Sequence, residues 1–120
     1  MLSISVENLS NLAVIECKGR IIRSDSVFKL RDIVQAQTAS HVIALDLSEV
    51  EAISGGGLGM LALLERWTRA HDIRLKLFCP SKPVLEGLAQ NRSILNFEIA
   101  SFHQMMSVLA HSDSRYSLAA

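Results

Sequence analysis

The sequence has few of the residues that carry covalent or metal chemistry. It contains only two cysteines, Cys17 and Cys79, which lie far apart in apolar, strand-like runs. There is no C-x-x-C pair and no Cys/His cluster at metal-ligand spacing. This pattern favours two buried, reduced thiols and a cytoplasmic protein. We therefore expect no disulfide framework and no bound metal or other cofactor.

A net charge and a long apolar run are also missing. Twelve basic and twelve acidic side chains cancel in 120 residues, so no overall field attracts a polyanion, and nucleic acid is not expected as a partner. No apolar run approaches the roughly 20 residues that a membrane span needs. The N-terminus lacks the basic and apolar regions of a secretory signal. With 49% hydrophobic and 20% charged residues, the composition is typical of one soluble globular domain.

What the sequence does contain is an alternation of strand-like and helix-like segments. Strands are predicted at residues 4–7, 13–19, 41–47, 73–79 and 94–100, and helices at 24–37, 57–70, 82–91 and 102–110. The first helix has one buried stripe of Val27, Leu30, Ile33 and Val34, residues 48–54 link the third strand to the glycines, and Ser81 can cap the helix over 82–91. This order predicts a single α/β domain over residues 1–110, with a mixed, mainly parallel sheet of four to five strands and about four helices. Residues 111–120 are expected to form a frayed polar tail.

A run of glycines, Ser54-Gly55-Gly56-Gly57-Leu58-Gly59, stands where a strand is followed by a helix. Such a turn exposes backbone N–H groups at the positive end of the helix dipole, which permits anion binding in principle. The known phosphate motifs do not fit, because no lysine lies between Lys29 and Lys76 and Met60 replaces the third glycine of the dinucleotide pattern. Ser54 lacks a G-x-S-x-G context and a nearby histidine, so it is expected to cap the helix.

The helix after the glycines is apolar on nearly all sides for two turns. One stripe can face the sheet and leaves Leu58 and Leu63 outside it. Either neighbouring helices cover this second apolar face, or it is a docking patch with Leu58 and Met60 near its centre. Glycines at the start of the helix would let the backbone of a partner approach closely. The stripe that faces the sheet holds Met60, Leu61, Leu64 and Trp67.

The segment VIALDLSEVEAISGGGLGMLALLERW, residues 42–67, resembles the core of a STAS domain, the module of anti-sigma-factor antagonists and of sulfate-transporter tails. The family pattern has an apolar strand, a short link, D-S-S-G-L-G or D-S-T-G-L-G, and a helix. The order of the other segments agrees over residues 4–110. The resemblance implies the STAS fold and a non-enzymatic module that binds a protein, either a kinase-like anti-sigma factor or a subunit of a transport complex.

The resemblance also assigns roles within the glycine run. Aligned on residues 57–59, Gly56 stands at the phosphoacceptor position of the family, Gly55 at the serine before it and Ser54 at the aspartate. In the family, phosphate at this position disrupts docking of a partner that is both kinase and anti-sigma factor. Glycine has no hydroxyl, so the resemblance implies a domain without the usual phosphoswitch. The implied partner-binding residues are Ser54, Gly55, Gly56, Gly57, Leu58 and Met60.

Other functions stay open at this point. A small-anion sensor could use the N–H groups of the glycine turn, although no cation lies within the turn. The sequence also permits a homo-oligomer. An enzyme is not expected, because no histidine pairs with a nucleophile or with another metal ligand at a useful spacing.

Overall fold

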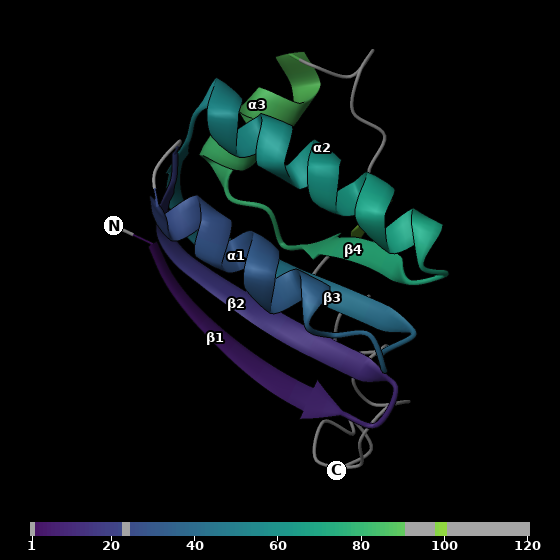
Figure 1. Ribbon diagram of the computed structural model, residues 1–120. Coiled ribbons are helices and arrows are strands. Elements are labelled where there is room, and N and C mark those ends of the chain that lie inside the picture. Colours follow the sequence, from purple (N-terminus) through teal and green to yellow (C-terminus); the bar gives the residue numbers. More distant parts are fainter. Residues whose placement is uncertain (1, 23–24, 91–97, 101–120) are drawn as a thin grey trace, which may run out of the picture.

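The computed structural model of the protein describes residues 2–22, 25–90 and 98–100. They form a five-stranded sheet in the order β1-β2-β3-β4-β5, in which only the β1–β2 pair is antiparallel (Figure 1). The predicted mixed, mainly parallel sheet is therefore confirmed. The predicted helix over 102–110 and the tail over 111–120 lie outside the described residues. The elements are β1 (Leu2–Leu9), β2 (Leu12–Ile21), α1 (Asp25–Gln35), β3 (Val42–Ile53), α2 (Gly55–Ala70), β4 (Arg74–Phe78), α3 (Lys82–Gln90) and β5 (Glu98–Ala100).

The opening hairpin closes through a tight turn. Leu9 pairs with Leu12, and Ser10 between them adopts the left-handed conformation with φ 52°. The prediction that Gly19 ends the second strand is wrong, because β2 continues to Ile21. Gly19 has φ 111° and lies at a register shift in the pairing with β3, so it bends the strand without ending it.

Strand β3 is longer than its sequence suggested. Residues 48–53 were expected to link the strand to the glycines, yet they continue it and pair with β2 as far as Ile21 opposite Ile53. Val50 is buried while Glu49 and Glu51 are exposed, which is the alternation of a strand with one covered face. The sequence changes abruptly from an all-apolar run to this alternation, so the periodicity did not predict the second half of the strand.

Helix α3 covers the part of β3 that extends beyond β4. The pairing of β3 with β4 ends at Asp46 opposite Phe78. Beyond this point, the Ser81 backbone N–H donates to the Leu47 carbonyl at 3.2 Å, and the Ser81 hydroxyl donates to the Val50 carbonyl at 2.7 Å. Ser81 directly precedes α3, as expected of its cap, and its carbonyl accepts from the Leu85 N–H at 2.9 Å, while its side chain ties the start of that helix to β3.

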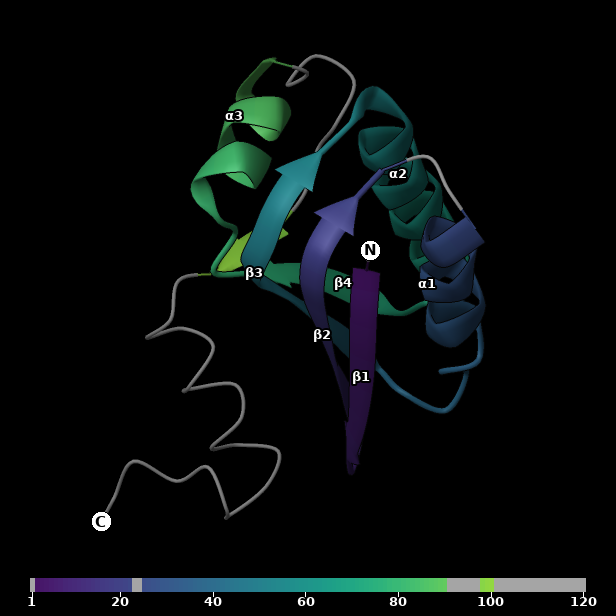
Figure 2. The same ribbon diagram turned by 90° about the vertical axis from the view of Figure 1, so that its left-hand side faces the viewer.

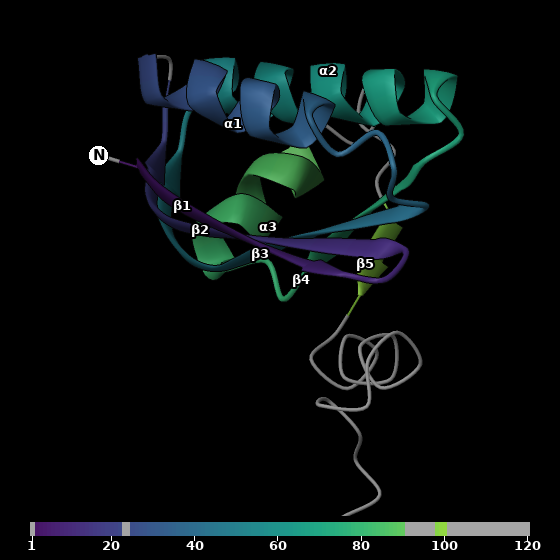
Figure 3. The ribbon, with the colours of Figure 1, turned by 60° about the horizontal axis from the view of Figure 1, so that its bottom comes forward.

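The main core lies between the sheet and the helices. Figure 3 shows α1 and α2 side by side over one face of the sheet. The predicted buried stripe of α1 is confirmed, with Val27, Leu30 and Val34 at most 2% exposed and Ile33 packed against the core. Strands β2 and β3 contribute alternate side chains to the same core, namely Ala13, Ile15, Cys17, Ile43, Leu45 and Leu47.

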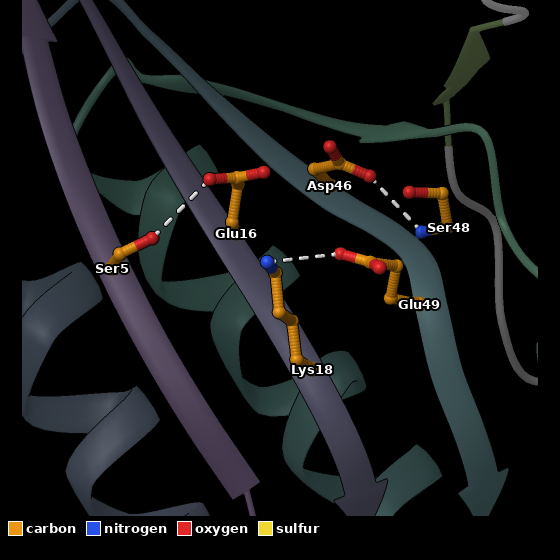
Figure 4. A network of polar contacts seen from close by, with 6 residues as sticks. All are labelled: Ser5, Glu16, Lys18, Asp46, Ser48 and Glu49. Atoms are coloured by element: carbon orange, nitrogen blue, oxygen red, sulfur yellow. Dashed lines mark hydrogen bonds and ion pairs between the residues drawn. The ribbon is translucent and has the colours of Figure 1, made fainter.

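The opposite face of the sheet is part apolar and part polar. A second buried cluster of Leu9, Leu12, Ala44 and Phe78 lies there. Further along the same strands, the Ser5 hydroxyl donates to Glu16 at 3.3 Å and Lys18 pairs with Glu49 at 3.2 Å (Figure 4). The hydrogen bond and the charge of Glu49 raise the pKa of Lys18. Close to these pairs, the Asp46 carboxylate accepts a hydrogen bond from the Ser48 backbone N–H.

The two thiols differ in their surroundings. Cys17 is buried in the main core, and this burial, with the nearby Asp46 and Glu16 carboxylates, raises the pKa of its thiol to about 12. Cys79 is only half-buried and lies directly after β4 with φ 49°. The expectation of two buried thiols therefore holds for Cys17 alone, and both thiols are free.

In the ranges 2–22, 25–90 and 98–100, no helix is long and apolar enough to cross a membrane. The longest of them, α2, has 16 residues.

Candidate partner-binding turn

The glycine turn lies at the carboxyl ends of the two central strands. Figure 2 shows β2 and β3 pointing to the same end of the sheet, where α2 begins. Ser54 is the N-cap of α2, with extended backbone (φ −96°, ψ 172°). Its hydroxyl accepts from the Gly57 N–H at 3.1 Å, and its carbonyl accepts from the Leu58 N–H at 2.9 Å. The prediction of a capping serine is confirmed.

Gly57 is the residue at which the end of β2 contacts the start of α2. The Ser54 backbone N–H donates to the Ile21 carbonyl oxygen at 3.0 Å. A Cβ atom placed on Gly57 would lie 2.1 Å from this same oxygen. Because real Cβ atoms do not approach a backbone oxygen so closely, this position requires glycine as long as β2 and α2 keep their distance.

The other glycines of the turn face outward. Gly55, Gly56 and Gly59 are exposed. A Cβ atom at Gly55 or Gly59 would have no neighbouring atom within 4 Å. The outer surface of the turn is therefore bare backbone with open space in front of it, and a partner can approach it closely.

The interpretation of Leu58 and Met60 as the centre of an exposed docking patch is wrong. Leu58 is 9% exposed and Met60 is 7% exposed, so both side chains belong to the core. A Cβ atom on Gly87 of α3 would lie 3.3 Å from Leu58 Cδ1, which places α3 against Leu58. The alternative interpretation, in which neighbouring helices cover the second apolar face, is confirmed for Leu58. Leu63, at 37%, is the exposed large hydrophobic side chain of α2.

The turn carries no charge of its own. No ionisable residue occurs between Glu51 and Glu65 in the sequence, and the first turn of α2 has no acidic residue. Two of the backbone N–H groups that an anion would need, those of Gly57 and Leu58, already donate to Ser54. What remains for an anion is the helix dipole, with no cation in the sequence of the turn itself, and this is a weak site.

Potential metal ligands do not gather into a site in the described ranges. No group of three or more His, Cys, Asp or Glu side chains there could hold a metal ion. His71 caps the opposite end of α2 from Ser54, where its Nδ1 lies 2.8 Å from the Trp67 carbonyl oxygen. Its ring stacks on Trp67 with 4.1 Å between centroids. His71 therefore has a structural role at the helix C-terminus.

Two residues that shape the turn were not identified from the sequence. Ile21 acts through its backbone carbonyl, so its side-chain type carries no signal. Gly87 lies inside α3, and its neighbours Ile53 and Leu58 come within 3.3 Å of where a Cβ would stand. An isolated glycine inside a helical pattern often marks such close packing, and this signal was available.

The fold and the turn together define a small α/β domain whose distinctive surface is a glycine-rich helix start. A family model for the STAS domain matches residues 3–109. The chain therefore belongs to the STAS domain family. No curated protein sequence matches the chain.

Solved structures share this fold. An anti-sigma factor antagonist from Mycobacterium paratuberculosis has a TM-score of 0.73 at 17% identity, covering 93% of this chain and 94% of that chain. The anti-sigma factor antagonist SpoIIAA in its unphosphorylated form has a TM-score of 0.70 at 16% identity, covering 91% and 97%. SLC26A9 matches with a TM-score of 0.68 at 15% identity, over 94% of this chain but 22% of its own. At these identities the likeness shows the fold alone.

Proposed function

We propose that this STAS domain is a non-enzymatic regulatory module of the cytoplasm, which binds a protein through the outer surface of the glycine turn. The turn is defined here as residues 54–59. The observation that carries the proposal is the bare, uncharged backbone of Gly55, Gly56 and Gly59 at the carboxyl edge of the sheet. In open α/β sheets, this edge is where ligands usually bind.

A protein partner fits this surface better than an anion does. Exposed glycines allow a second backbone to come close, and they offer hydrogen-bonding groups without side chains in the way. The absence of charge in the sequence of the turn removes the attraction that a phosphate or sulfate would require. The buried side chains of Leu58 and Met60 support the turn from the core, so a partner would not contact them directly.

The proposed binding is not controlled by phosphorylation of the turn. Gly56 stands at the position that carries the phosphoacceptor hydroxyl in the family resemblance, and glycine cannot accept phosphate. Ser54 has the one hydroxyl of the turn, and this hydroxyl is used to cap α2 through Gly57. Control would come from abundance, competition or another subunit.

Two kinds of partner are compatible with the domain. The likeness to anti-sigma factor antagonists over nearly the whole of both chains favours a kinase-like anti-sigma factor. The likeness to a part of SLC26A9 supports the alternative, a subunit of a transport complex. The recovered partner distinguishes these alternatives, whereas the proposed surface is the same for both.

The surface can be tested by site-specific photo-cross-linking in cells that make the protein. A photoreactive side chain replaces Leu63, which is exposed one helical turn after Gly59, so that the glycine backbone itself stays bare. A control replaces Ala70 at the exposed far end of α2. We expect a covalent adduct with one protein from position 63 and none from position 70. Equal adducts from both positions, or an adduct from position 70 alone, would exclude the turn as the docking surface.

A charge at the turn provides a second test with the partner so identified. Gly59→Asp should weaken binding by about tenfold or more, because a carboxylate at a close backbone contact must lose its water. Ala70→Asp serves as the matched control and should leave the affinity unchanged. Circular dichroism of both variants shows whether the fold is retained.

A further inference from the structure

Strand β1 is an open edge of the sheet. Its eight residues pair with β2 on one side, and no described element lies along its other side (Figures 1 and 2). The strand contains no proline, lysine or arginine, and its pairing with β2 runs without a register shift. Natural proteins usually protect edges by such residues, by bulges or by short strands. The opposite edge, β5, is protected in this way because it has three residues.

The two faces of β1 differ in polarity. Ile4 packs against the main core on the helix side, and Val6 on that side is 38% exposed. Ser5 lies on the opposite side, where its hydroxyl donates to Glu16 (Figure 4). Ser3 and Glu7 follow the same alternation as Ser5 and are exposed. A second strand beside β1 would therefore meet apolar side chains on one face and polar ones on the other.

The hairpin turn determines which backbone groups of β1 point outward. A two-residue turn closes on a hydrogen-bonded pair, which here is Leu9 with Leu12. Residues at alternate positions from Leu9 therefore bond to β2. Ile4, Val6 and Asn8 direct their N–H and C=O groups away from β2, where an added strand can bond to them.

We propose that β1 pairs antiparallel with β1 of a second copy of this chain, around a two-fold axis at Ser5. This register places Ile4 opposite Val6 of the second copy, so the outward backbone groups of these residues bond to each other. It covers the exposed Val6 with an apolar neighbour on the helix side. On the other face, Ser3 lies opposite Glu7 of the second copy, and Ser5 lies opposite Ser5 of the second copy. No like charges therefore face each other.

Self-complementarity is the reason to name a second copy as the occupant. The only charged side chain of β1, Glu7, faces a hydroxyl in this register. Ile4 and Val6 of one copy face Val6 and Ile4 of the other, so the apolar side chains of both strands lie on the same face. The glycine turn lies beyond the ends of β2 and β3, away from the β1 edge (Figure 2). The dimer would leave that turn accessible, so the inference is independent of the proposed function.

Size-exclusion chromatography with light scattering of the full chain tests the dimer. A reversible dimer is expected, with a dissociation constant of roughly 1 μM to 1 mM, because one pair of edge strands makes a small interface. Ser5→Lys should raise this constant by about fivefold or more, since like charges then meet on the two-fold axis. Within one chain this variant faces Glu16, so the fold should be retained.

Cysteine cross-linking tests the register. Ser5→Cys should form a disulfide-linked dimer under mild oxidation, because the two-fold axis brings this position next to its own copy. Ser3→Cys, exposed on the same face, should cross-link far more slowly, and the wild type reports any background from Cys17 and Cys79. A protein that stays monomeric at concentrations up to roughly 1 mM would overturn the proposal. A dimer that Ser5→Lys does not weaken, or equal cross-linking of the two cysteine variants, would also overturn it.

Discussion

Gly57 and Gly59 are two residues apart at the start of the same helix, yet their surroundings are opposite. A Cβ atom on Gly57 would lie 2.1 Å from the Ile21 carbonyl oxygen, whereas one on Gly59 would have no neighbour within 4 Å. Gly55 resembles Gly59 in this respect. The contact between β2 and α2 thus requires one glycine of the run. Packing does not require the glycines at 55 and 59, and the proposed docking surface would account for their bare backbone.

The largest effect is expected at the required glycine. Gly57→Ala should lower the free energy of unfolding by about 3 kcal/mol or more, because a backbone oxygen cannot move aside as a side chain can. Thermal unfolding measures this loss, and Gly59→Ala is the matched control. Equal melting temperatures for Gly57→Ala and the wild type would remove the distinction between the two glycines.

A slightly smaller effect is expected beneath the turn. Leu58→Asp should cost about 3 kcal/mol, because it places a charge in the core between α2 and α3. Leu63→Asp, at an exposed position of the same helix, should change the stability by less than about 0.5 kcal/mol. Urea unfolding of the two variants compares the covered and the open side of α2. Similar losses would show that Leu58 is not part of the core.

The cap should have an intermediate effect. Ser54→Ala removes the acceptor for the Gly57 N–H and should cost about 1 kcal/mol. Ser54→Asp keeps an acceptor oxygen and adds a charge that favours the helix N-terminus, so it should retain the stability. Thermal unfolding of this pair decides whether Ser54 acts as a cap. A loss of the same size in both variants would contradict that role.

The smallest effect is expected at the open glycines, and its sign is opposite. Gly59→Ala should stabilise the domain by about 0.5–1 kcal/mol, because alanine loses less backbone freedom in a helix. Gly59 does not adopt a positive φ, so alanine fits its backbone. If Gly59→Ala destabilised the domain by urea unfolding, the surroundings of this residue would be tighter than described.

Much of the fold could be predicted from periodicity. The amphipathic stripe of α1 and the apolar runs of β2, β3 and β4 gave the order of elements and the mainly parallel sheet. The end of β3 was not predicted because Ser48, Glu49 and Glu51 resemble a polar link, although Glu49 and Glu51 flank the buried Val50 as in a strand. Pairing with β2 keeps these residues in the strand, and a local pattern does not contain this information.

The candidate site could be predicted only in part. Ser54 as a cap follows from residue type and position, and the structure confirms it. The burial of Leu58 depends on α3 packing against it, and the need for glycine at 57 depends on the Ile21 carbonyl. Both are contacts between segments far apart in the sequence, so the local pattern could not separate Gly57 from Gly55 and Gly59.

The central claim is that the turn has lost its phosphoswitch while keeping an open surface. Phosphosite mapping by mass spectrometry tests it most directly, on wild type and Gly56→Ser isolated from cells that make the protein. We predict phosphate on the introduced hydroxyl of Gly56→Ser and none on residues 54–59 of the wild type. Stoichiometric phosphate on Ser54 of the wild type would contradict the account.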